Sequence, residues 1–326
     1  MNATPFLSPL TLHGGLVRLE PLQHGHAEEL RSVVADGRLY ELWFTSVPKP
    51  EAVPAYIDAA LDMQARYVAL PFAVRVQSAF LGWPPLIQDE LLDWLRRSRE
   101  ATRSGDRAST AAVAQEFERL VDRMRAARRE SAPDQDISAE LMHLQVDGRA
   151  LDLRELASVL RNWTVGEVGT IAASIGILVH WLATSPDWQQ RLRAQPALLP
   201  PAIDEVLRID GPLAANRRIV RRAVALGGRQ FEPGDRLTIH WIAANRDPRA
   251  FDEPDSFRID RDPSPNLLYG AGIHVCPGAP LARLELRVLM EELLARTSAI
   301  TLAESRPPVR AVHPDAGYAA LLVRLV

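Results

Sequence analysis

The sequence has 326 residues, of which 47% are hydrophobic and 24% charged, values typical of a globular protein with a sizeable core. Its 38 Lys and Arg residues against 41 Asp and Glu residues leave a net charge of −3, which gives no reason to expect a nucleic-acid partner. One cysteine cannot form an internal disulfide, and the sequence shows no signal peptide, so we expect a cytoplasmic protein. The longest apolar run, residues 168–183, falls short of a membrane span.

In chain order, the sequence predicts a strand and two helices before residue 66, and mainly helices after residue 70. The strand is expected at 16–22 and the two helices near 26–34 and 51–65. Longer helices are expected at about 86–101, 108–129, 153–184, 198–209 and 281–296, with loops at 105–107 and 129–136. Short strands are expected at 218–225, 237–243 and 319–326. The basic runs 96–103 and 119–129 are predicted to be solvated helix faces.

The single cysteine, Cys276, lies in the stretch Tyr269-Gly-Ala-Gly-Ile-His-Val-Cys-Pro-Gly278. A thiolate suits zinc, copper(I), iron–sulfur clusters and haem iron, but zinc and iron–sulfur sites need further protein ligands. One cysteine therefore suffices only where a cofactor supplies the other donors, as haem does with four nitrogens. Two other interpretations stay open: a small buried hydrophobic side chain, and a catalytic nucleophile with a histidine base, although no oxyanion-hole pattern is present.

The neighbours of Cys276 suit a haem. Gly270, Gly272 and Gly278 allow the backbone to approach a flat macrocycle, and His274 can reach a haem propionate. The helix that follows places its positive end near the thiolate.

This stretch and the following Ala-Pro-Leu-Ala-Arg-Leu-Glu-Leu resemble the haem-binding loop and next helix of the cytochrome P450 family. Tyr269 stands where that family usually has phenylalanine, while Gly272, His274, Cys276 and Gly278 match its loop. The resemblance implies a mainly α (α+β) fold over residues 69–326, haem b (iron protoporphyrin IX) as cofactor, and Cys276 as the axial iron ligand.

A second set of residues matches the same family. Glu205 and Arg208 lie at i and i+3 on one helix face, where they can pair, and they resemble the family's structural Glu-x-x-Arg. Arg261 is the matching candidate for its third partner. Arg218 takes the place of an arginine that binds a haem propionate, with Arg217 or Arg221 as alternatives.

The helix predicted through 162–183 carries small residues on one face. Gly166, Gly169, Ala173 and Gly176 fall within about a third of its circumference, with Thr170 on the same arc. Such a stripe allows either a neighbouring helix or a flat cofactor to pack closely, and the sequence leaves both possibilities open.

By the same resemblance, this helix crosses the distal face of the haem, with Gly166 beside the cofactor and Thr170 delivering protons. The acid that the family carries immediately before the threonine is replaced by Gly169, and Glu167 lies one turn earlier. Thr170 and Glu167 are the predicted catalytic residues, and Gly169 leaves open whether O₂ or peroxide is the oxidant.

The start of the chain resembles a second family. Residues 16–30 (LVRLEPLQHGHAEEL) and 39–61 (LYELWFTSVPKPEAVPAYIDAAL) are similar to the start of a GNAT-type acetyltransferase. The pyrophosphate-binding loop of such enzymes does not follow. The sequence therefore predicts a small α/β fragment, 1–68, fused to a cytochrome P450-like domain, 69–326, that lacks the family's N-terminal part.

The P450 resemblance implies a haem-thiolate monooxygenase that oxidises a small organic molecule with O₂. Its electrons come from a separate ferredoxin- or flavodoxin-type protein, because the chain shows no flavin or iron–sulfur module of its own. The alternatives are a peroxide-driven or atypical haem enzyme, a non-catalytic truncated haem-binding remnant and, last, an N-acetyltransferase. We expect no nucleic-acid or membrane partner.

Overall fold

The computed structural model describes residues 12–13, 18–19, 23–35, 48–57, 69–128, 135–304, 306–312 and 316–326. Its α-helices are α1 (Ala27–Ala35), α3 (Ala69–Phe80), α4 (Gln88–Ser104), α5 (Arg107–Ala127), α6 (Ile137–His143), α7 (Leu153–Ala183), α8 (Pro186–Ala194), α9 (Leu199–Ile209), α10 (Trp241–Ala244) and α11 (Ala279–Arg296). Short 3₁₀ helices are η1 (His24–His26), η3 (Pro50–Ala52), η4 (Pro85–Ile87), η5 (Pro196–Leu198) and η6 (Gly272–His274).

The strands are short and pair two by two, each pair antiparallel. They are β1 (Leu12–His13) with β2 (Arg18–Leu19), β3 (Gln145–Val146) with β4 (Arg149–Ala150), β5 (Ala215–Ile219) with β8 (Arg236–His240), β6 (Val224–Leu226) with β7 (Arg229–Phe231), β9 (Ile300–Leu302) with β12 (Val323–Leu325), and β10 (Val309–Arg310) with β11 (Tyr318–Ala320). The described part of the chain is therefore mainly helical, as the sequence predicts.

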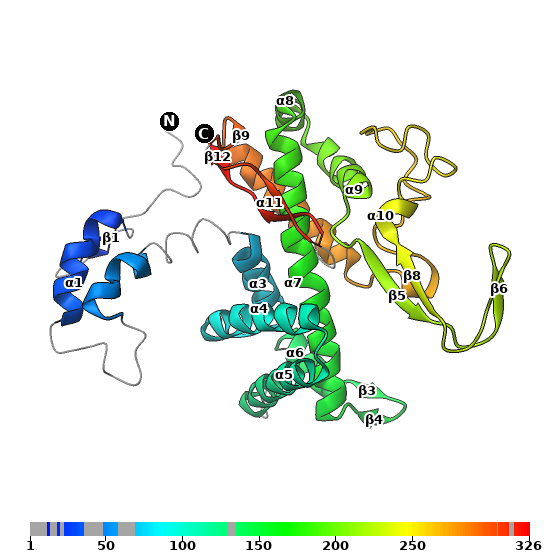
Figure 1. The fold of residues 1–326 in the computed structure, drawn as a ribbon, viewed down its shortest axis with the longest axis horizontal. Helices are drawn as coiled ribbons and strands as arrows, with labels where there is room; N and C mark the ends of the chain where they lie inside the picture. The colour runs from blue at the N-terminus through cyan, green and yellow to red at the C-terminus, as the bar shows by residue number, and fades with distance from the viewer. Residues whose placement is uncertain are drawn as a thin grey trace.

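Helix α7 runs through the middle of the helical part of the protein, and α3, α5, α9 and α11 all contact it (Figure 1). It begins at a capping box, in which the Asp152 carboxylate accepts from the Glu155 N–H at 2.8 Å and Glu155 accepts from the Asp152 N–H at 2.9 Å. Helices α3 and α5 pack against its first half, and α9 and strand β9 also contact it. One hydrophobic core extends through these elements.

By length and composition alone α7 could cross a membrane, with a mean hydropathy of 1.5 over its most apolar window. The sequence analysis considered only residues 168–183, whereas the helix continues back to Leu153. Leu156, Val168 and Leu182, spread along the helix, are each at most 2% exposed. One face of α7 is therefore buried in the protein core along its whole length, while Val159 and Val165 on other faces are exposed.

Most of the long helices fall where the sequence predicts them, and α3, α6 and α8 are additions. The segment predicted as a strand at 237–243 is β8 only to His240, after which α10 begins. The strand predicted at 218–225 is divided between β5 and β6. The tail forms strands, as predicted, and β12 pairs with β9 beyond the end of α11.

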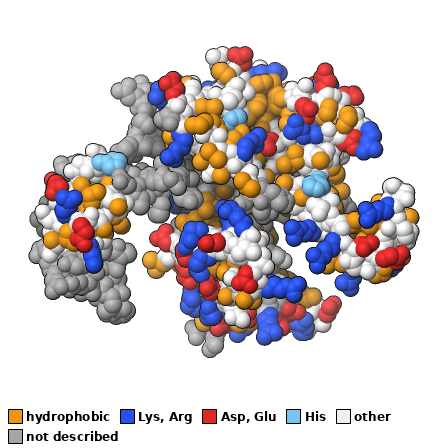
Figure 2. Space-filling view, viewed as in Figure 1, with side chains coloured by type: hydrophobic (Ala, Val, Ile, Leu, Met, Phe, Trp, Pro, Cys, Tyr) orange, Lys and Arg blue, Asp and Glu red, His pale blue; other side chains and the backbone are white. Residues whose placement is uncertain are grey.

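The two basic runs lie on α4 and α5, where most of their charge is paired with acids. Arg97 pairs with Glu116 across the two helices, and Arg123 pairs with Glu90 at 2.5 Å. Over the displayed face of the molecule, basic and acidic side chains are interspersed (Figure 2). An exception to the predicted solvated faces is Arg128, which is buried and pairs with Asp136 at 3.0 Å.

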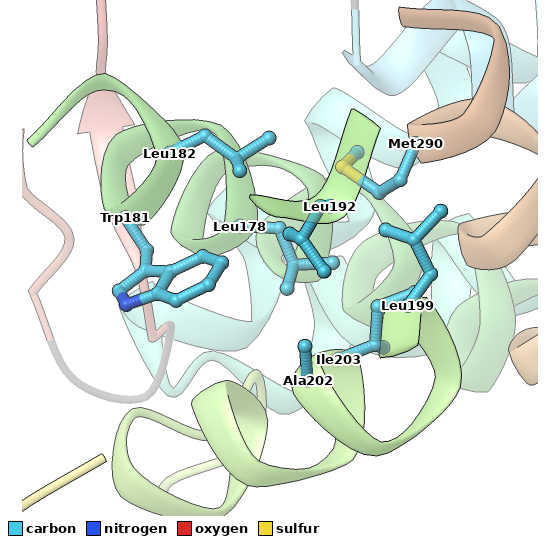
Figure 3. Close-up of a pocket in the computed structure, with 8 residues that line it drawn as sticks. All are labelled: Leu178, Trp181, Leu182, Leu192, Leu199, Ala202, Ile203 and Met290. Carbon is cyan, nitrogen blue, oxygen red and sulfur yellow. The ribbon is translucent and has the colours of Figure 1, made fainter. Parts of the chain in front are cut away.

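A small cavity of about 10 Å³ lies among α7, α8, α9 and α11 (Figure 3). Its lining is entirely apolar: Leu178, Trp181, Leu182, Leu192, Leu199, Ala202, Ile203 and Met290. A cavity of this size holds about one water, which would find no polar partner there. It is a packing feature of the helical core and has no place in the chemistry considered below.

In the N-terminal part, a separate small apolar cluster joins α1 to the segment that begins at η3. Val53 and Ile57 are each 1% exposed and Val34 is 6% exposed. The strand predicted at 16–22 is represented by β2 alone, and most of the predicted helix 51–65 lies outside the described residues.

Candidate functional site

Cys276 lies at the end of a tight loop that joins the chain before it to α11. Its N–H donates to the Tyr269 carbonyl at 2.8 Å, which closes the loop, and the side chain is half-buried. The Cys276 carbonyl accepts from the N–H of Ala279, the first residue of α11. The positive end of α11 therefore stands next to the cysteine.

Two glycines of this loop have left-handed backbones, with φ of +76° at Gly270 and +62° at Gly272. A Cβ on Gly270 would lie 2.9 Å from the His274 carbonyl oxygen, so any side chain there would displace the loop. A Cβ on Gly272 would meet nothing within 4 Å, and one on Gly278 would lie 3.8 Å from the Cys276 sulfur. Gly270 thus shapes the loop, while Gly272 leaves space beside it.

Tyr269 connects the loop to α9 and α11. The Arg283 guanidinium of α11 lies over the Tyr269 ring, 4.4 Å from its centre, and pairs with Asp204 of α9 at 2.9 Å. Burial, with added repulsion from Asp204, raises the pKa of the Tyr269 hydroxyl, which therefore stays protonated. His274 is exposed on η6.

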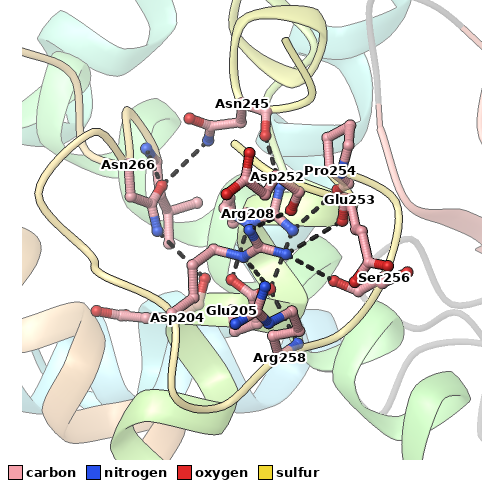
Figure 4. A network of polar contacts seen from close by, with 12 residues as sticks. Asp204, Glu205, Arg208, Asn245, Asp252, Glu253, Pro254, Ser256, Arg258 and Asn266 are labelled. Carbon is pink, nitrogen blue, oxygen red and sulfur yellow. Dashed lines mark hydrogen bonds and ion pairs between the residues drawn. The ribbon is translucent and has the colours of Figure 1, made fainter. Parts of the chain in front are cut away.

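Glu205, Arg208 and Arg261 meet in one buried network beneath this loop. Figure 4 shows Glu205 and Arg208 among the groups around them. Arg208 is 1% exposed, and its guanidinium donates to Glu205 at 2.7 and 3.0 Å. It also donates to the carbonyls of Asn245 at 2.6 Å and Pro254 at 2.9 Å. Arg261 donates to Oε1 of Glu205 at 2.9 Å, the oxygen that also accepts from Nη2 of Arg208.

The remaining donors of Arg261 reach the carbonyls of Asp252, Glu253 and Ser256, so this arginine fixes the coil before the cysteine loop. Burial alone would raise the pKa of Glu205, but the hydrogen bonds from Arg208 and Arg261 outweigh it and lower that pKa. Glu205 is therefore ionised at neutral pH, and its buried carboxylate accepts hydrogen bonds from both arginines.

The sequence analysis missed two asparagines that tie this network to the cysteine loop. The Asn245 amide donates to the Asn266 side-chain oxygen at 3.1 Å and accepts from the Leu267 N–H at 2.7 Å. Since Arg208 binds the Asn245 carbonyl, the path from α9 to the loop is continuous. No local pattern signals these residues, because each acts on a segment about 20 residues away.

Arg218 lies on β5 and is half-buried, whereas Arg217 and Arg221 are exposed. Its guanidinium donates to the Arg217 carbonyl at 2.9 Å. The alternation of the strand places Arg218 on the face that also carries Asn216, whose side chain accepts from Trp241. Of the three arginines, Arg218 is the one on the more protected face.

On α7, the predicted stripe of small residues meets different neighbours along its length. A Cβ on Gly166 would meet nothing within 4 Å, whereas one on Gly176 would touch Tyr318 of β11. The Thr170 hydroxyl donates to the carbonyls of Gly166 at 2.7 Å and Glu167 at 3.1 Å. Gly176 thus lies against β11 at an ordinary van der Waals distance that would admit a Cβ, while Gly166 leaves open space beside the helix.

At Gly169, where the related family carries an acid, a cation stands nearby. The end of the Arg99 guanidinium, from α4, would lie 3.3 Å from a Cβ built on Gly169. No ion pair of Arg99 occurs among the described residues.

Glu167 instead faces Glu285 of α11, a residue that the sequence analysis did not single out. Burial, more than any other cause, raises the pKa of Glu167 to about 7. Burial and repulsion from Glu167 raise the pKa of Glu285 to about 8. The indole N–H of Trp163 donates to Glu167. Glu285 lies between exposed Leu284 and buried Leu286, so its burial carries no signal in the sequence.

These residues fit a haem. No group of three or more His, Cys, Asp or Glu side chains suited to a metal ion occurs in the described part of the chain, so Cys276 lacks the companions that a bare ion needs. Haem iron needs one such donor, and the open positions beside Gly166 and Gly272 allow a flat group to approach. Ile273 and Val275, next to the cysteine, expose apolar side chains of the kind that cover a macrocycle.

Comparisons with known proteins agree with this description. The family model "Cytochrome P450" matches residues 91–314. Cytochrome P450 126 of Mycobacterium tuberculosis is 49% identical over 123 residues, 38% of this chain and 30% of that protein. Cyclomarin C epoxidase of Salinispora arenicola is 32% identical over 234 residues, 71% of this chain and 59% of that protein.

A solved structure extends the likeness to nearly the whole chain. CYP109E1 of Bacillus megaterium, determined in complex with testosterone, aligns with a TM-score of 0.72 and 24% identity over 97% of this chain and 88% of its own. The chain spans less than two thirds of the length of the two curated relatives above. The alignments give no support to the acetyltransferase-like fragment at 1–68, nor to the expected loss of the family's N-terminal part.

Proposed function

The chain belongs to the cytochrome P450 family, and from this premise we propose that it is a haem-thiolate monooxygenase acting on a small organic substrate. Its oxidant is O₂, and its electrons come from a separate ferredoxin- or flavodoxin-type protein. We propose that the protein acts in the cytoplasm and binds neither a membrane nor a nucleic acid. The observation that carries the proposal is Cys276, half-buried at the N-terminus of α11 with Gly270 and Tyr269 shaping its loop.

In this proposal Cys276 binds the iron of haem b, and the thiolate-ligated haem supplies the oxygen-activating chemistry. Gly272 and Gly278 line the proximal side, and Tyr269 and Gly270 hold the loop. His274 and Arg218 neutralise the propionates. Glu205, Arg208 and Arg261 fix the coil that carries the loop.

On α7, Gly166 would leave room for the cofactor and the substrate, and the Thr170 hydroxyl, which donates to the Gly166 carbonyl, would hold and pass on a proton. Glu167 is the ionisable group on this turn of α7. The epoxidase relative supports oxygen insertion into an organic molecule as the class of reaction.

A second candidate is peroxide-driven oxidation, which Gly169 favours because no acid stands directly before Thr170. Peroxide already carries the two protons and two electrons that O₂ must acquire, so a site poor in acids suits it.

Purified protein, reduced and treated with carbon monoxide, tests the proposal. A thiolate-type Soret shift that Cys276→Ala abolishes and His274→Ala retains is expected. Oxygen uptake coupled to NADH through a surrogate ferredoxin system then separates O₂-driven from peroxide-driven turnover. Protein that binds no haem would refute both candidates.

A further inference from the structure

Two carboxyl groups are buried together where α7 packs against α11. Glu285 is 6% exposed, and its carboxyl is close enough to that of Glu167 for each to shift the pKa of the other. Among the described residues, neither oxygen of Glu285 and only one oxygen of Glu167 has a hydrogen-bond donor. That one donor is the Trp163 indole N–H.

An ionised carboxylate only accepts hydrogen bonds, so two ionised groups here would leave three buried oxygens without donors and would repel each other. One proton between them removes both problems, because the protonated carboxyl donates to the ionised one. No cation of the described residues acts on either carboxyl: the causes that shift them are burial, Trp163 and each other. The nearby cation of α4, Arg99, lies instead against Gly169.

Glu167 lies on the same turn of α7 as Thr170, the residue that the proposed function gives the role of passing protons. Between Arg161 and His180, Glu167 is the only ionisable residue of the helix. At 100° per residue, Thr170 lies between Gly166 and Glu167 around the helix axis. Its hydroxyl donates to the carbonyls of both residues. The position directly before Thr170, usually acidic in the family, is Gly169.

We propose that Glu167 and Glu285 share one buried proton and that this pair supplies the Thr170 face of α7 in place of an acid at position 169. The inference rests on the proposed function. Monooxygenation consumes one O₂, two electrons and two protons per substrate and forms the oxygenated product and one water. One proton leaves the pair through Glu167, both carboxyls are then ionised, and a proton from solvent restores the pair. Glu285 is a positioning residue, because it acts through Glu167.

Infrared spectroscopy of the purified protein tests the shared proton without turnover. The C=O stretch of a buried protonated carboxyl is expected at neutral pH, and it should disappear reversibly as the pH is raised to about 9. Glu285→Gln and, separately, Glu167→Gln should each weaken the band, because one of the two carboxyls is lost and the other keeps only the effect of burial. Glu292→Gln, on the exposed side of α11, should retain it. Absence of the band from the wild-type protein at neutral pH overturns the proposal, whether or not the variants fold.

Turnover tests the use of the proton. For Glu285→Gln we expect the share of electrons recovered in product to fall several-fold, hydrogen peroxide to rise, and the dependence on pH between 6 and 8 to flatten. The carbon monoxide spectrum should not change. A product share and pH profile equal to those of the wild type would refute the role in proton supply. A carboxyl band in protein that binds no haem would refute the proposed function and leave the shared proton standing.

Discussion

The two sides of the candidate haem site differ in how their buried polar groups are satisfied. Beneath the cysteine loop, Glu205 and Arg208 are almost completely buried, and the charges of both are bound by other protein groups. On the α7 side, the carboxyls of Glu167 and Glu285 are also buried, yet three of their oxygens have no donor among the described residues. The first arrangement stabilises a scaffold, whereas the second is costly for the fold and is typical of a group kept for chemistry.

The largest loss of stability is expected from a substitution in the network of Glu205, Arg208 and Arg261. Arg208→Ala leaves Glu205 buried with its charge only partly compensated, so we expect the free energy of unfolding to fall by about 3–5 kcal/mol. Chemical denaturation followed by circular dichroism measures it. The matched control is Arg249→Ala, which removes an exposed arginine from the same coil and should change stability little. Equal losses in both variants would contradict the distinction.

A smaller loss is expected from Gly270→Ala. The new Cβ requires a left-handed backbone and meets the His274 carbonyl at 2.9 Å, so we expect a loss of about 1–3 kcal/mol and weaker haem retention. Gly105→Ala is the control, because Gly105 has a similar φ of +69° but open space around its Cβ. Thermal denaturation and haem content measure both variants. If Gly105→Ala costs as much, the carbonyl contact contributes nothing.

The buried carboxyls of Glu167 and Glu285 should make the free energy of unfolding depend on pH. The pKa values of Glu167 and Glu285, raised to about 7 and about 8, mean that the folded protein binds more protons than the unfolded chain between about pH 4.5 and 8. The free energy of unfolding therefore falls as pH rises through this window. Glu285→Gln removes much of this slope, so its stability relative to the wild type should rise by about 1–2 kcal/mol from pH 5 to pH 8.

Glu205 should change the stability with pH in the opposite direction from Glu167 and Glu285. Because its pKa is lowered, its contribution to stability is complete above the ordinary carboxyl pKa of 4.5 and is lost as pH falls below that value.

Denaturation curves at pH 4, 5, 7 and 8 distinguish the contribution of Glu205 from that of Glu167 and Glu285. A Glu285→Gln variant whose stability runs parallel to that of the wild type from pH 5 to pH 8 would contradict the shared proton.

The smallest effect is expected from restoring an acid at position 169. In Gly169→Asp the new carboxylate lies beside the flexible end of Arg99, so we expect a stability change within about 1 kcal/mol. A double-mutant cycle with Arg99→Leu, measured by thermal denaturation at low and high salt, should give a favourable coupling that salt weakens. A coupling energy of zero would show that Arg99 does not pair with the new carboxylate.

The sequence predicted the parts of the site that are local. The cysteine loop and the Glu205–Arg208 pair are short patterns on one turn or one helix, and the long helices carry clear periodicity, so both could be found without a structure. Helix α3 was missed because its apolar residues continue around much of its circumference rather than along one face. The division of 215–226 between two strands depends on pairing with β8 and β7, which lie farther along the chain.

The contacts that the sequence could not predict join distant segments. Asn245 with Asn266, Gly169 with Arg99, and Glu167 with Glu285 are each set by how helices and coils pack, and none has a fixed spacing. Glu285 in particular stands next to exposed Leu284 and buried Leu286, so its alternation with leucines gives no hint of which face is covered. The likeness to an acetyltransferase rested on a strand, two helices and an aromatic cluster, features too common to identify a family.

Ligation of iron by the Cys276 sulfur can be tested most directly by X-ray absorption at the iron edge of the purified protein. We expect one sulfur neighbour together with the porphyrin nitrogens in the wild-type protein, and no sulfur neighbour in Cys276→Ala. An iron centre without sulfur in the wild type, or one that keeps sulfur in the variant, would contradict the assignment on which the proposed chemistry depends.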